Sequence, residues 1–89
     1  MSGRWDADSS SGFLRRIGRS AHELGATTGN ASCPDIWELA NGDVAVIGTQ
    51  LRAEYLDRLP EGVTIDDHES LVVIPRSMLI AAKADIPDA

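Results

Sequence analysis

Residues 35–47 read Asp-Ile-Trp-Glu-Leu-Ala-Asn-Gly-Asp-Val-Ala-Val-Ile. The Asn41-Gly42 dipeptide near their centre is typical of a two-residue type I′ turn, because both central positions of that turn need a positive φ, which Asn and Gly tolerate. Strand-forming residues flank the dipeptide on both sides. This stretch therefore predicts a β-hairpin, and it is the strongest indication of fold in the chain.

The predicted turn also determines which residues lie opposite one another in the hairpin. Pairing outward from it places Leu39 opposite Val44 and Trp37 opposite Val46. Alternate residues of a strand point to opposite faces, so these four side chains share one face. We expect this face to turn toward the core, with Trp37 packed inside rather than exposed as a binding anchor.

The residues after the hairpin predict two helices and one more strand. An apolar stripe at helical spacing predicts a helix over 49–59, which Pro60 ends. Residues 71–74 are apolar on both faces and rich in β-branched side chains, which indicates a strand of the same sheet that is covered on both sides. Pro75 suits the start of a helix over 76–83. The predicted fold class is α+β, with a small sheet built on the hairpin.

The first thirty residues differ in composition from the rest. Residues 1–11 are rich in Ser, Gly and Asp and predict a flexible tail, and residues 26–32 predict a linker. Between them we expect a short helix over 12–24, because apolar residues recur there every three or four positions: Phe13, Leu14, Ile17, Ala21 and Leu24. We therefore divide the chain into a segment over 1–30 and a single acidic domain over 31–89.

The composition predicts an ordinary folded protein. The chain has 89 residues, 43% hydrophobic and 25% charged, which is enough for one small core. It contains one cysteine, so it can form neither an intrachain disulfide nor a cysteine cluster for zinc, and a reducing compartment suits it. We find no apolar run typical of a signal peptide or a membrane span, and we expect a cytoplasmic protein.

The net charge of −6 is unevenly distributed along the chain. Residues 1–30 sum to +1, whereas residues 31–89 carry four basic and eleven acidic side chains and sum to −7. An acidic surface repels phosphate groups, so we expect no direct nucleic-acid binding by residues 31–89. The same charge would attract a basic protein partner.

Two groups of residues suggest chemistry, and for each we favour a simpler interpretation. Cys33 could pair with His22 or His68 as a nucleophile, but no acid or base stands at a diagnostic spacing from it. The consecutive polar residues 66–69 could hold a cation, but calcium loops space their ligands differently, and a solvated turn explains this run better. We therefore predict no catalytic residue, no metal site and no cofactor.

The predicted helix over 12–24 is basic as well as amphipathic, which makes it the main candidate for an interaction surface. Its apolar stripe could pack on its own domain or across a homodimer, on a partner protein, or on lipid or nucleic acid. Only three clustered arginines are available to bind lipid or nucleic acid, so we favour the first two alternatives over the last. The candidate interaction residues are Phe13, Arg15, Arg16, Ile17, Arg19 and Leu24.

The stretch from Cys33 to Gly48, followed by Leu71-Val72-Val73-Ile74-Pro75-Arg76, resembles small acidic actinobacterial proteins. More distantly, the order of a hairpin introduced by Cys, a strand and a helix started by Pro is similar to the BldB-like small regulators. This resemblance implies a protein that acts through protein contacts and is encoded beside a helix-turn-helix DNA-binding regulator.

Taken together, these observations predict a non-enzymatic regulatory protein-interaction module whose partner is a protein such as a DNA-binding regulator. The alternative is a small-molecule-binding or enzymatic module that uses Cys33 and a histidine.

Overall fold

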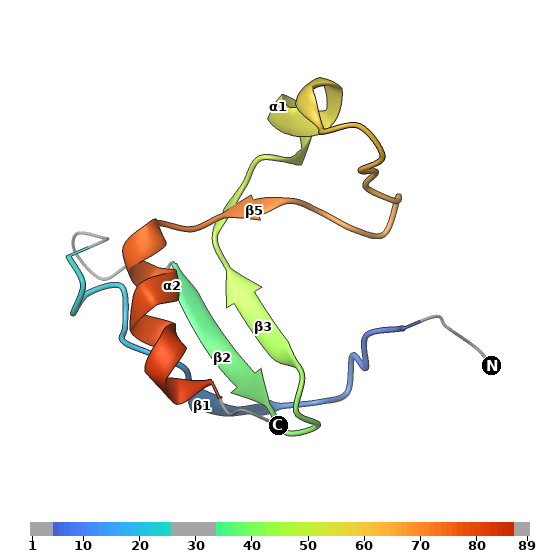
Figure 1. Ribbon diagram of the computed structural model, residues 1–89. Coiled ribbons are helices and arrows are strands. Elements are labelled where there is room, and N and C mark those ends of the chain that lie inside the picture. Colours follow the sequence, from blue (N-terminus) through green and yellow to red (C-terminus); the bar gives the residue numbers. More distant parts are fainter. Residues whose placement is uncertain (1–4, 26–33, 87–89) are drawn as a thin grey trace.

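The computed structural model describes residues 5–25 and 34–86 (Figure 1). Strands β1 (Phe13–Arg16), β2 (Asp35–Leu39) and β3 (Val44–Ile47) form an antiparallel sheet in the order β1-β2-β3. Strands β4 (Thr49–Gln50) and β5 (Val72–Val73) form a second, two-stranded sheet. The helices are α1 (Arg52–Tyr55), which continues into the 3-10 turn η1 (Leu56–Arg58), and α2 (Arg76–Ala82), which continues into η2 (Lys83–Asp85). The predicted α+β class is confirmed.

The hairpin forms where the sequence predicts it, but its turn is of another type. The Gly42 N–H donates to the Leu39 carbonyl at 3.0 Å, and the Leu39 N–H donates to the Asp43 carbonyl at 2.8 Å. Gly42 has a φ of +94°, whereas Asn41 has no positive φ. These bonds describe a three-residue loop with a bulge at Gly42, so the predicted type I′ turn is wrong.

The longer loop moves the pairing by one residue. Trp37 lies opposite Ala45, and Glu38 lies opposite Val44. A shift of one residue sends side chains to the other face, so Trp37 shares a face with Ala45 and not with Val44 and Val46. The predicted core face of Trp37, Leu39, Val44 and Val46 is therefore wrong, and Trp37 is only half-buried.

The predicted helix over 12–24 is absent, because residues 13–16 form strand β1. Arg15 lies opposite Glu38 and Arg16 opposite Trp37, with an irregular register between Phe13 and Arg15. Cross-strand ion pairs of both arginines favour the strand over the local helical pattern. The helical tendency survives only as a turn over 20–25, where Ser20 and Glu23 cap each other through their side chains and backbone N–H groups.

The core lies between the first sheet and α2. Its buried residues come from β2, from α2 and from the segment that follows β1: Ile17, Ala21, Ile36, Met78 and Ala82. A Cβ on Gly18 would lie 2.9 Å from the Ala82 nitrogen, so α2 comes close to the backbone just after β1. The segment over 13–24 thus belongs to the same core as the hairpin. The predicted linker over 26–32 lies outside the described residues.

The predicted strand over 71–74 and the helix over 49–59 are present in shortened form. The strand pairs with β4 in the second sheet and not with the hairpin, and Val72 and Val73 are exposed, so its predicted place in the first sheet, covered on both sides, is wrong. At Gly48, directly before β4, a Cβ would lie 2.6 Å from the Val73 carbonyl oxygen, so glycine allows the two chain segments to approach this closely.

The predicted helix over 76–83 matches α2. Pro75 is its N-cap residue, and its extended backbone ends the preceding segment. Within residues 5–25 and 34–86, we find no helix with the length and apolar character that crossing a bilayer requires.

Candidate functional site

The structure divides the six candidate interaction residues among three places. Ile17 is buried and Leu24 packs against the core, whereas Arg19 is exposed and lies 3.6 Å from Glu23. The other three lie on β1: the Phe13 side chain is 65% exposed, and Arg15 and Arg16 form ion pairs with β2. These residues do not form one continuous surface of the kind that the predicted helix would have presented.

One face of the first sheet carries a cluster around Asp35, whose residue exposure is only 3%. Arg16 donates to both carboxylate oxygens of Asp35, at 2.9 Å each. The guanidinium of Arg16 also lies over the Trp37 ring, 4.9 Å from its centroid, and Phe13 meets that ring edge-on at 5.7 Å. This cluster joins β1 to β2.

The surroundings of Asp35 lower the pKa of its carboxyl group. Burial alone raises the pKa, but the hydrogen bonds and positive charge of Arg16, together with hydrogen bonding by Trp37 and by the Ile36 N–H, outweigh burial. Asp35 is therefore ionised in the folded protein at neutral pH. We assign this cluster a structural role, because both carboxylate oxygens of Asp35 and two guanidinium nitrogens of Arg16 are used in holding the strands together.

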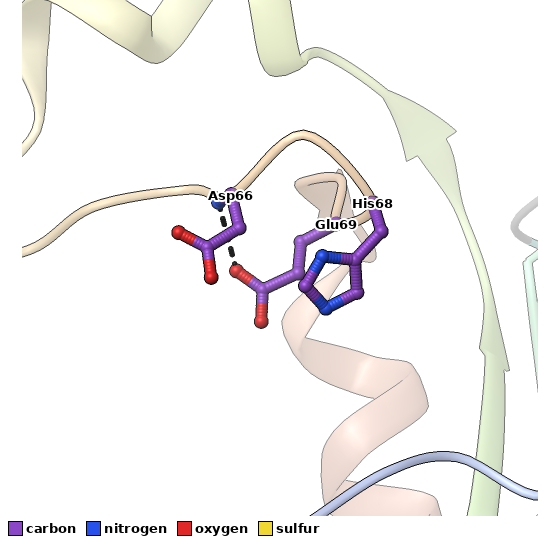
Figure 2. Close-up of side chains that lie close together, drawn as sticks. All are labelled: Asp66, His68 and Glu69. Atoms are coloured by element: carbon purple, nitrogen blue, oxygen red, sulfur yellow. Dashed lines mark hydrogen bonds between the residues drawn. The ribbon is translucent and has the colours of Figure 1, made fainter.

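The polar run over 66–69 forms a turn in which three side chains come together (Figure 2). Ligand-type atoms of Asp66, His68 and Glu69 all lie within 4.8 Å of one another. The Asp66 N–H donates to a Glu69 carboxylate oxygen at 2.9 Å, and the Glu69 N–H donates to the Asp66 carbonyl at 3.0 Å. All three residues are exposed, and the Glu69 carboxylate serves the turn itself, as in many solvated surface turns.

An apolar groove lies on the other face of the first sheet, between the sheet and α2. Its volume is about 220 Å³. Ile36, Val44 and Val46 form its floor, and Leu79 and Ala82 of α2 form one wall. The groove exists because α2 packs against β2 and leaves β3 uncovered (Figure 1).

The groove is lined mainly by apolar side chains that remain open to solvent. Val44 is 52% exposed, Val46 43% and Leu79 58%. Among the described lining residues, Glu38 alone is titratable, and Arg15 neutralises it with an ion pair of 2.7 Å. Apolar surface that is continuous and open is typical of a binding site for another molecule.

Two further contacts hold the groove's shape at the C-terminal end of α2. The Gly18 N–H donates to the Asp85 carboxylate at 2.8 Å, and Arg15 donates to the Asp85 carbonyl at 2.9 Å. These bonds join η2 to β1 and to the residues just after it, although the bonded residues are 67 and 70 positions apart in the sequence. The groove therefore lies between elements that are fastened to each other, and its opening is set by the fold.

Sequence reasoning missed the groove, although two signals pointed toward it. Val44 and Val46 were predicted to share a face, which the structure confirms, but that face is only partly covered. In α2, Met78, Leu79 and Ile80 are consecutive apolar residues, which is more than one buried helix face requires. Cys33, the residue on which the enzymatic alternative depends, lies outside the described residues.

Comparison of the chain with protein-family models, with curated proteins and with solved structures finds no match.

Proposed function

We propose that this chain is a non-enzymatic regulatory protein-interaction module, and that the groove between β3 and α2 receives an apolar segment of a partner protein. The observation that carries the proposal is the exposure of Val44, Val46 and Leu79 around one groove. Burying such side chains contributes about 25 cal/mol per Å² of apolar surface, which a peptide segment of matching shape can use.

The acidic character of the chain supports a basic partner. The domain over 31–89 is acidic as a whole, so Lys or Arg residues beside the bound apolar segment would speed association and orient it. A helix-turn-helix DNA-binding regulator is the partner class we propose, since DNA-binding proteins carry basic surfaces and the resemblance to BldB-like regulators implies such a partner.

We also propose a cytoplasmic location for the protein. A single cysteine suits a reducing compartment, and a DNA-binding partner would be found there in a bacterial cell.

Site-specific photo-crosslinking tests the proposed function. A benzophenone amino acid is placed at Ile86, which lines the groove, or at Val63, which is similarly exposed and does not line it. Both full-length chains are irradiated in a lysate of the source cells. We expect the Ile86 probe to capture one protein that the Val63 probe does not capture.

Two further substitutions make this test specific for the groove. Leu79 and Ile80 are neighbouring exposed residues of α2, and only Leu79 lines the groove. Leu79→Asp should abolish the capture, whereas Ile80→Asp should leave it unchanged. Equal capture by both probes, or equal loss with both substitutions, would contradict the proposal.

A further inference from the structure

Strand β3 forms an edge of the first sheet. It pairs with β2 on one side, and no other residue within 5–25 and 34–86 hydrogen-bonds to its backbone. Figure 1 shows β3 as the strand of this sheet that lies farthest from α2. An open edge of this kind can accept another strand, because its backbone groups are already aligned for pairing.

The hairpin bonds determine which backbone groups of β3 point outward. Asp43 accepts a hydrogen bond from Leu39, so in an antiparallel ladder Asp43, Ala45 and Ile47 direct their backbone groups toward β2. Val44 and Val46 consequently direct their N–H and C=O groups away from the sheet. The two outward-facing residues lie symmetrically on either side of Ala45.

The side chains of β3 do nothing to prevent pairing. The strand reads Val-Ala-Val-Ile, without a charged residue, a proline or a glycine. Natural edge strands usually carry a lysine, a proline or a bulge that blocks such association. Val44, Val46 and Ile47 are each more than 40% exposed, so this edge is apolar as well as open.

We propose that β3 pairs with β3 of a second copy of this chain, antiparallel and with a two-fold axis at Ala45. Val44 of one copy would then exchange hydrogen bonds with the partner's Val46, and the two sheets would become one continuous sheet of six strands. A two-fold interface requires a self-complementary surface, and the arrangement of Val44 and Val46 about Ala45 provides one.

The absence of charge along β3 and the small size of Ala45 both suit a second copy as the occupant of this edge. The chain carries a net charge of −6, so two copies repel each other except where the contacting surface is uncharged, as it is along β3. The two Asp43 residues would stand about 13 Å apart along the strands, beyond the Debye length of about 8 Å at physiological salt. The small Ala45 suits the axis, where the two backbones approach to about 4.5 Å.

This pairing uses the backbone of the edge, whereas the groove uses side chains of the face and of α2, so the inference does not rest on the proposed function. It does extend the groove. In the dimer both α2 helices lie on the same side of the sheet, and the valine floors of the two grooves become neighbours.

Sedimentation of the full-length chain provides the first test. We expect a mass of about twice 9.5 kDa at a chain concentration of about 200 µM, where micromolar contacts are saturated. Val46→Pro removes an outward N–H and leaves the bonds to β2 in place, so it should weaken association at least tenfold. Val46→Thr keeps that N–H and should retain the dimer. A monomer at 200 µM would overturn the inference.

Disulfide trapping provides a second test that does not depend on proline. In a Cys33→Ser background, Ala45→Cys should form an intermolecular disulfide on mild oxidation, because the two positions meet at the axis within the range that a disulfide spans. Ala53→Cys, at an exposed position of α1, should react at least tenfold more slowly. Equal rates at the two positions, or a dimer that Val46→Pro does not weaken, would place the interface elsewhere and overturn the inference.

Discussion

Asp35 shows how much of this fold depends on one side chain. Its carboxylate is buried and receives two hydrogen bonds from Arg16, and the same guanidinium covers the Trp37 ring. A buried charge is tolerated only where it is paired and hydrogen-bonded. The cluster therefore replaces, on this face of the sheet, the apolar packing that α2 provides on the other.

Replacing Asp35 by Asn should lower the free energy of unfolding at pH 7 by about 1–3 kcal/mol, because Arg16 would lose its charged acceptor. The pKa of Asp35 is lower in the folded than in the unfolded protein. Its contribution is thus fully present above the unfolded value of about 3.9 and is lost as the pH falls below that value toward the folded one. Urea unfolding from pH 7 to pH 3 measures both effects.

The control for this prediction is Asp67→Asn, which changes an exposed carboxylate of the turn over 66–69. We expect it to alter the free energy of unfolding by less than about 0.5 kcal/mol. An Asp35→Asn chain as stable as the unsubstituted chain at pH 7 would show that the ion pair does not stabilise the fold.

At the scale of elements, the closest approach in the core is that of α2 to the backbone after β1. Gly18 has a φ of +82° and Gly42 a φ of +94°, so both favour glycine for the same conformational reason. They differ in their surroundings, because a Cβ at Gly18 would meet the α2 backbone, whereas one at Gly42 would meet nothing within 4 Å.

We expect Gly42→Ala to lower the free energy of unfolding by about 1 kcal/mol, which is the usual cost of a positive φ. Gly18→Ala should cost about 1–3 kcal/mol more, because α2 must move away from the sheet. Chemical unfolding of the two variants measures this difference. Equal losses would mean that α2 does not lie as close to Gly18 as the structure places it.

The sequence was sufficient to predict the hairpin and α2, because their signals are local. Asn41-Gly42 separates two strand-forming runs, and Pro75 directly precedes a run whose apolar residues recur at helical spacing. It was insufficient for the register, since the same dipeptide also suits a three-residue loop with a bulge. For residues 12–24, helical spacing competed with pairs between β1 and β2, and those pairs join positions at least 19 residues apart. No local pattern carries that information.

The candidate groove was only partly predictable for the same reason. That Val44 and Val46 share a face follows from alternation along a strand. Whether α2 covers the two valines depends on where the helix crosses the sheet. The close approach of Gly18 to Ala82 determines that position. A hairpin pattern specifies a face, but it does not specify how much of that face a distant helix covers.

Across the whole molecule, burial is concentrated in two parts of the chain. The buried residues among those described lie within 17–36 and 78–82, and none lies within 37–77. The second sheet and α1 therefore form an arm held by backbone bonds and half-buried side chains. Local unfolding costs least where few apolar groups are buried.

Hydrogen exchange should reveal this difference between two similar amide groups. The Ile17 N–H bonds to the Ile36 carbonyl at 2.9 Å in the core, and the Leu51 N–H bonds to the Leu71 carbonyl at 3.0 Å in the arm. We expect the Leu51 amide to exchange at least tenfold faster, a difference of about 1.4 kcal/mol in opening free energy. Equal protection of the two amides would show that the arm and the core open together.

The packing of Arg16 and Phe13 against Trp37 also makes the fluorescence of this tryptophan a reporter for the separation of β1 from β2. In a Trp5→Phe background, indole fluorescence would come from Trp37 alone, and its environment changes when β1 leaves β2. Far-ultraviolet circular dichroism follows the backbone structure of the whole chain, including α2. Superimposable unfolding curves from the two signals would therefore show that the contact of β1 with β2 and the secondary structure are lost in a single cooperative step.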